Sequence, residues 1–169
     1  MSETKQLTVT LLPSLEPNKK RKVTEHKNWK SNVSTEKQWN LLNQLMTNPP
    51  VKDSEEKLLS SQIQYKLSGY KYQDMEKNKY NAETFITMSQ VLELFSISRM
   101  ICQYCQETCL LLYEKVRDSQ QWSLDRIDND LGHSYNNVCL SCLKCNLKRR
   151  VTQYKKFLFT KNAVICKLD

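Results

Sequence analysis

The chain has 169 residues, and 26 Lys and Arg against 18 Asp and Glu give it a formal net charge of +8. This length suits one ordinary domain with extensions, and the basic balance favours a polyanionic partner. No apolar run approaches the roughly 20 residues that cross a membrane. The cysteines number seven, an odd count, and no apolar signal segment begins the chain. Both features argue against a secreted disulfide framework and predict an intracellular protein of a reducing compartment.

Residues 1–33 mix Thr, Ser, Asn and charged side chains without sustained periodicity, so we expect a basic arm that is disordered in isolation. Its basic run, Lys19 to Lys22, is typical of a nuclear import address or of a phosphate-binding arm, and it would suit a nuclear or virus-associated protein. A merely solvated tail would carry the same run. The sequence leaves these interpretations open.

Residues 34–83 are expected to form a helical extension. A first helix is predicted over 34–46, where Thr35 and Gln38 make a capping-box pattern; its apolar face comprises Trp39, Leu42 and Met46. A second helix is predicted to begin after Asp53 and to be weakened at Gly69; its apolar stripe comprises Leu59, Ile63, Leu67 and Tyr70. The Lys- and Tyr-rich stretch 70–80 either stacks on nucleic-acid bases or forms a solvated helix face with a few tyrosines packed inward.

Residues 84–169 are predicted to form one zinc-containing domain. Thr87 and Gln90 repeat the capping-box pattern before an apolar run, so a short helix is expected to lead into this domain and to cover it as a hydrophobic lid. At its end, residues 155–167 fit either a strand or a short helix, because periodicity cannot separate the two at this length.

Two Cys-x-x-Cys pairs bracket the centre of this domain, Cys102 with Cys105 and Cys142 with Cys145. Each pair places two thiolates on one tight turn, and two pairs complete the tetrahedral shell of a structural Zn²⁺. The 36 residues between Cys105 and Cys142 exceed the insert of a simple zinc ribbon. Cys109 is a competing ligand in place of Cys105, whereas Cys139 is expected to be a small buried side chain.

Between the pairs, the pattern predicts a strand over 121–128, a turn at 129–132 and a second strand over 138–141. The segment 146–157 lacks Gly and Pro and is predicted to be a helix. The predicted fold class is therefore α+β. The order strand, loop, strand, helix would bring Asp125 on the first strand within reach of Asn146 at the start of the helix.

The pattern LDRIDND-x-GH-x3-NV-x3-C-x2-CN resembles the HNH endonuclease superfamily, most of all its DRxD variant in phage and giant-virus proteins and in a rare-cutting restriction endonuclease. The residues that carry it are Asp125, Ile127, Gly132, Asn137, Cys142, Cys145, Asn146 and Lys148. The resemblance covers residues 84–157. It implies a small ββα-metal domain, treble-clef-like and stapled by structural zinc.

The same resemblance implies a catalytic site. A hard divalent ion, Mg²⁺ or Mn²⁺, would bind the Asp125 carboxylate and the Asn146 amide oxygen, polarise a scissile phosphate and stabilise the leaving 3′ oxygen. Asn137 would fix the loop between the strands. Arg126 departs from the family pattern, which has a His general base at this position, because a guanidinium cannot accept a proton.

Three interpretations of Arg126 stay open. Arg126 clamps the phosphate while another group is the base. Alternatively, a nearby His or Tyr side chain takes over the role of the missing His. In the third interpretation, no base exists and the module only binds DNA. The candidate bases are His133, Tyr104, Tyr113 and Tyr135. A loop histidine that makes a structural hydrogen bond is the alternative interpretation of His133.

We therefore expect a metal-dependent DNA endonuclease that hydrolyses phosphodiester bonds, with structural Zn²⁺ and catalytic Mg²⁺ or Mn²⁺. Its contacts to the DNA backbone are predicted at Lys144, Lys148, Arg149 and Arg150. The alternatives are a non-catalytic zinc DNA-binding module and a virion or chromatin structural protein. Symmetric double-strand cuts would need a homodimer, but nothing in the chain identifies an interface.

Overall fold

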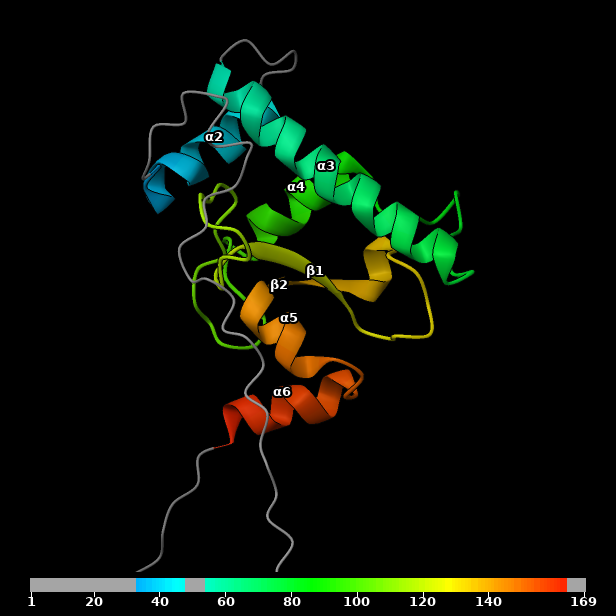
Figure 1. Cartoon of the computed structure of the whole chain (residues 1–169). Helices are drawn as coiled ribbons and strands as arrows, with labels where there is room; N and C mark the ends of the chain where they lie inside the picture. The colour runs from blue at the N-terminus through cyan, green and yellow to red at the C-terminus, as the bar shows by residue number, and fades with distance from the viewer. Residues whose placement is uncertain (1–32, 48–53, 164–169) are drawn as a thin grey trace, which may run out of the picture.

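The computed structural model describes residues 33–47 and 54–163. Helices surround a small antiparallel hairpin of two strands (Figure 1). The predicted basic arm lies outside the described residues, apart from Val33, so its basic run Lys19 to Lys22 has no structural outcome. The same holds for the last residues, 164–169.

Helix α2 spans Thr35–Thr47, close to the predicted bounds. Its cap differs from the predicted one, because the Ser34 hydroxyl accepts a 3.2 Å hydrogen bond from the Lys37 amide. Gln38 is buried instead of capping the helix, and its Oε1 accepts hydrogen bonds from the amides of Leu111 and Leu112. The predicted apolar face was also partly wrong, since Met46 is 42% exposed.

Helix α3 spans Ser54–Glu76 and buries Leu59, Ile63 and Leu67, as the apolar stripe predicts. It continues past Gly69 for two further turns, so the expected weakening does not end the helix. These turns contain part of the Lys- and Tyr-rich stretch. Tyr72 is exposed, whereas the Tyr70 hydroxyl accepts a 3.0 Å hydrogen bond from the Leu124 amide. Within the stretch, Tyr70 therefore packs inward against the hairpin, and Tyr80 is half-buried beside Phe85.

Helix α4 spans Met88–Ile97, and both hydrogen bonds of the predicted capping box are present. The Thr87 amide donates to the Gln90 side chain at 2.9 Å, and the Gln90 amide donates to the Thr87 hydroxyl at 3.3 Å. Phe95 meets Trp122 edge-on, with 5.0 Å between ring centroids. Helix α4 thus lies on the hairpin as the predicted hydrophobic lid.

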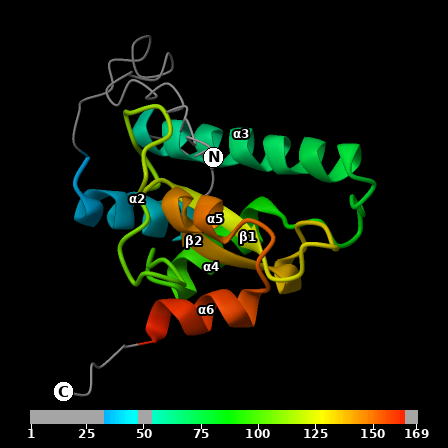
Figure 2. The same cartoon turned by 60° about the horizontal axis from the view of Figure 1, so that its bottom comes forward.

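Strands β1 (Trp122–Arg126) and β2 (Val138–Cys142) pair antiparallel, with Trp122 opposite Cys142 and Arg126 opposite Val138. Strand β1 is shorter than predicted, because after Arg126 the chain turns into a loop that ends in the short 3₁₀ helix η1 (Tyr135–Asn137). Both faces of the hairpin are buried. Helices α2, α3 and α4 lie on one side of it and α5 and α6 on the other (Figures 1 and 2).

The helix predicted over 146–157 was wrong in its bounds. Helix α5 begins earlier, at Leu143, directly after β2, and ends at Arg149. Arg150 has a positive φ of 50°, a backbone conformation that stops an α-helix. A second helix, α6, spans Tyr154–Asn162 and includes the FLF segment, which is therefore helical.

One hydrophobic core contains side chains from α2, α3, α4, both strands and α6. Its fully buried members include Leu42, Leu59, Phe95, Trp122 and Leu140. The chain is thus a mixed helical and antiparallel-sheet fold. The division into segments 34–83 and 84–169 stays a prediction, although their side chains share this core.

Candidate functional site

The four predicted cysteine ligands come together at one end of the hairpin. Cys102 and Cys105 lie in the loop after α4, Cys142 ends β2, and Cys145 lies in the first turn of α5. Their sulfur atoms all lie within 4.8 Å of one another. Tetrahedral Zn–S bonds of about 2.3 Å place sulfurs about 3.8 Å apart, and the Sγ atoms of Cys105 and Cys142 are 3.8 Å apart. The four cysteines can therefore bind a structural metal such as zinc.

Backbone amides also point at this cluster. The amides of Tyr104 and Cys142 donate to the Cys102 sulfur at 3.5 and 3.3 Å. Hydrogen bonds from Cys109 and Cys142 lower the pKa of the Cys102 thiol, which favours its thiolate. Thiolates are the form that binds metal, so the two backbone amides favour the ligand form of Cys102.

Two of the remaining cysteines are described, and neither belongs to this cluster of four. Cys109 is buried beside Cys102 but is not one of the four clustered sulfurs. Cys139 is buried on β2, its Sγ 3.7 Å from the Tyr104 hydroxyl, and burial raises the pKa of its thiol to about 12. Cys166 lies outside the described residues.

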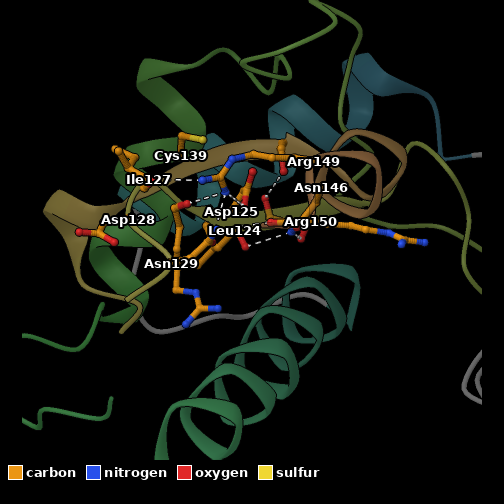
Figure 3. A network of polar contacts seen from close by, with 12 residues as sticks. Leu124, Asp125, Ile127, Asp128, Asn129, Cys139, Asn146, Arg149 and Arg150 are labelled. Carbon is orange, nitrogen blue, oxygen red and sulfur yellow. Dashed lines mark hydrogen bonds and ion pairs between the residues drawn. The ribbon is translucent and has the colours of Figure 1, made fainter. Parts of the chain in front are cut away.

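The second predicted site centres on Asp125, which is buried on β1. Its Oδ1 accepts a 2.7 Å hydrogen bond from Arg149 Nη1 in an ion pair (Figure 3). Its Oδ2 accepts one of 2.7 Å from the Tyr104 hydroxyl. Burial raises the pKa of the Asp125 carboxyl, whereas the bonds from Tyr104 and Arg149 act in the opposite direction. The guanidinium is therefore the counter-charge that favours ionised Asp125.

Arg149 was predicted to bind nucleic acid, and its position corrects that assignment. Its side chain is 1% exposed. Nη1 also donates to the carbonyl of Arg126 at 2.7 Å, and Nη2 donates to that of Ile127 at 3.0 Å. These bonds fasten α5 to the end of β1, so we assign Arg149 to the Asp125 site and not to the surface.

Asn146, in α5, reaches the same strand. Its amide nitrogen donates to the Ser123 hydroxyl at 2.5 Å and to the Leu124 carbonyl at 3.3 Å. Figure 3 shows its side chain beside Asp125 and Leu124. Because both bonds use the nitrogen, the amide oxygen remains as an acceptor. The structure thus brings Asp125 and Asn146 to one place, as their sequence positions predicted.

Asn137 fixes the loop between the strands. Its side-chain oxygen accepts from the Asp128 amide at 2.9 Å, and its nitrogen donates to the carbonyls of Asp128 and Gly132 at 3.0 and 2.9 Å. One side chain therefore ties both ends of this loop together. This geometry agrees with the loop-fixing role expected of Asn137.

Arg126 and His133 both turn toward α3. Arg126 Nη1 donates to the Leu131 carbonyl at 3.2 Å and lies 3.9 Å from Asp74 Oδ1. The Nδ1 atom of His133 lies 2.8 Å from the same oxygen. Asp74 was not foreseen, since it is 59 residues from His133 in the sequence and no motif marks it.

Of the three tyrosines proposed as alternative bases, two have a pKa that is raised above its ordinary value. Burial, followed by the neighbouring thiol of Cys139 and the Asp125 carboxylate, raises the pKa of Tyr104 far above its ordinary value. Burial and Glu93 raise that of Tyr135. Tyr113 is buried, with Lys66 Nζ 5.1 Å from the centre of its ring. A useful general base has a pKa near the working pH, which these shifts oppose for Tyr104 and Tyr135.

The other predicted backbone-contact residues, Lys144, Lys148 and Arg150, are exposed on α5 and directly after it. Within residues 33–47 and 54–163, no helix has the length and apolar character needed to span a membrane. No protein-family model, curated protein or solved structure matches the chain.

Proposed function

We propose that the chain is a metal-dependent DNA endonuclease built on an HNH-like ββα-metal module. The observation that carries the proposal is the contact of Asn146 with Ser123 and Leu124, which precede Asp125 on β1, from a helix that also holds Cys145 of the four-cysteine cluster. The module is the hairpin β1–β2 followed by α5. In it, a structural Zn²⁺ would be bound by Cys102, Cys105, Cys142 and Cys145.

A divalent ion has acceptor atoms available in this site. Each oxygen of Asp125 receives one hydrogen bond, and a carboxylate offers about four lone-pair sites in all. The Asn146 oxygen is oriented by the two bonds of its nitrogen. Mg²⁺ or Mn²⁺ prefers such oxygen ligands, and its chemistry when bound would be to polarise a phosphate and to stabilise the departing oxygen.

The charge distribution supports a polyanionic substrate. No acidic residue occurs between positions 131 and 168, a stretch with eight Lys and Arg. Five of these side chains are exposed on or beside α5 and α6: Lys144, Lys148, Arg150, Lys155 and Lys156. These basic side chains, on α5, directly after it and on α6, would attract phosphates and position the backbone of DNA.

The test is nicking of supercoiled plasmid with Mg²⁺ or Mn²⁺ by the wild-type chain and by the variants Asp125→Ala and Asn146→Ala. We expect cleavage by the wild type and loss of it in both variants, because each removes a ligand of the divalent ion. Asp125→Ala also leaves the buried Arg149 unpaired, so zinc content is measured as a check on folding. Glu83→Ala, which removes an exposed carboxylate outside the site, is the matched control and should cleave normally.

A second candidate is a zinc module that binds DNA without cutting it. The observation that favours it is the ion pair between Asp125 and Arg149, because a guanidinium already balances the carboxylate that an ion would use. Salt-dependent DNA binding by the wild type without nicking, or equal nicking by the wild type, Asp125→Ala and Asn146→Ala, would reject the endonuclease.

A further inference from the structure

Asp74 is a buried acid on the last turn of α3, far in sequence from the cysteine module. Its side chain is 1% exposed, and both of its oxygens meet His133. Oδ2 accepts a 2.6 Å hydrogen bond from the His133 amide, and Oδ1 lies 2.8 Å from His133 Nδ1. One turn earlier, Tyr70 packs on the imidazole with 4.6 Å between ring centroids. Helix α3 therefore holds this histidine in one orientation.

This contact assigns the protons of the imidazole. A carboxylate only accepts hydrogen bonds, so Nδ1 carries the hydrogen and Nε2 is left with a lone pair. Among the described residues, Nε2 has no hydrogen-bond partner, and it is not one of the fully buried unpartnered atoms. Asp74 and His133 line a cavity of about 220 Å³ together with Lys79, Thr84 and Ser134. His133 thus lies at the wall of a space large enough for water, and Nε2 is the ring nitrogen that Asp74 leaves free to accept a hydrogen bond.

The dyad adjoins the Asp125 site through Arg126, the next residue on β1. Arg126 Nη1 lies 3.9 Å from the same Asp74 oxygen that meets His133. Gly132 allows the loop to approach this closely, because a Cβ there would lie 2.9 Å from Asp74 Oδ2 and still closer to the Lys79 carbonyl oxygen. The loop, α3 and the end of β1 therefore converge on one carboxylate.

We propose that Asp74 is a positioning residue and His133 the proton acceptor of the endonuclease site, an assignment that rests on the proposed function. A water proton passes to His133 Nε2 as the water oxygen bonds to phosphorus and the bond from phosphorus to the 3′ oxygen breaks. The 3′ oxygen takes a proton from solvent, and the imidazolium returns its proton to solvent. Asp74 keeps Nε2 in the accepting tautomer and stabilises the imidazolium.

The charges around the imidazole agree with this role. Burial lowers the pKa of His133, Asp74 opposes that shift, and Arg126 and Lys77 add to it. The uncharged Tyr70 ring covers one face. His133 is therefore neutral near pH 7 and becomes cationic only on acidification, which is the behaviour that a proton acceptor needs.

The experiment combines tautomer analysis with cleavage kinetics on the full chain. The chain has two histidines, so His26→Gln leaves one imidazole, whose two ¹⁵N resonances should report a hydrogen on Nδ1 and none on Nε2. In nicking assays, His133→Gln should lower kcat by about 10² to 10⁴ and Asp74→Asn by about 10- to 100-fold, both with unchanged KM. The acid limb of the wild-type kcat/KM profile should match the pKa of His133 measured by NMR on the free chain, and Asp74→Asn should move it to lower pH. Asp74→Glu should recover part of the rate. Glu83→Gln is the matched control, because it removes one negative charge, as Asp74→Asn does, from an exposed residue.

Each contrary result has a defined meaning. A hydrogen on Nε2 in the neutral imidazole of the His26→Gln chain, where His133 is the remaining histidine, overturns the assignment. Wild-type rates in His133→Gln, together with loss of cleavage in Asn146→Ala, reject the dyad and leave the endonuclease standing. Absence of any cleavage that depends on Asn146 rejects both. An acid limb that Asp74→Asn does not move shows that Asp74 only supports the fold.

Discussion

Replacing Arg149 with Met tests whether the buried guanidinium holds the module together. Methionine retains most of the length and apolar packing of arginine but removes its charge and its donors. The change leaves Asp125 as an unpaired carboxylate that is buried and strips the carbonyls of Arg126 and Ile127 of their partner. We therefore expect Arg149→Met to cause a large loss of stability, although the sequence suggested that Arg149 is a surface residue.

The magnitude follows from the contacts. Breaking a buried ion pair by removal of one partner costs about 3 to 5 kcal/mol. The 2.7 Å separation and the 1% exposure of the Arg149 side chain place this pair in that class. The double variant Arg149→Met with Asp125→Asn should be more stable than the sum of the single changes by about 1 to 3 kcal/mol, because the two residues are in direct contact.

The assay is urea unfolding of the zinc-loaded protein followed by circular dichroism. Arg150→Met is the matched control, since it makes the same substitution at the next residue, which is exposed, and it should change stability little. The effect on DNA binding should be the reverse of the effect on stability: Arg150→Met should weaken binding more than Arg149→Met does. A loss of less than about 1 kcal/mol in Arg149→Met, the range of an exposed ion pair, would refute the structural role of Arg149.

Three further predictions concern metal, charge and pH. Cys105→Ser should lose stoichiometric zinc and Cys109→Ser should retain it, as measured by atomic absorption; the opposite pattern would exchange their roles. Lys148→Ala should reduce the slope of log binding constant against log salt by about 0.9, and an unchanged slope would remove Lys148 from the DNA contact. Because burial lowers the pKa of His133, the unfolded chain binds its proton more readily, so the free energy of unfolding should fall as pH drops below about 6.5; His133→Gln should reduce that fall, and an equal fall would contradict it.

Local patterns predicted much of the secondary structure because their causes lie within a few residues. The capping box at Thr87 and the apolar stripe of α3 are interactions between neighbouring turns, and both are present. The predicted cap of α2 was wrong by one residue, because Gln38 makes its hydrogen bonds with residues far away in the sequence. It binds the amides of Leu111 and Leu112, and no local pattern can show such a contact.

By itself, the sequence determined the cysteine cluster, the hairpin and the meeting of Asp125 with Asn146, because the spacing of two Cys-x-x-Cys pairs around two strands allows few arrangements. Tertiary structure alone decided the surroundings of that site. It buried Arg149 against Asp125 and brought Asp74 from α3 to His133. Both contacts satisfy a charge taken out of water, and the partner of a buried charge is chosen by proximity in space, which the order of residues does not reveal.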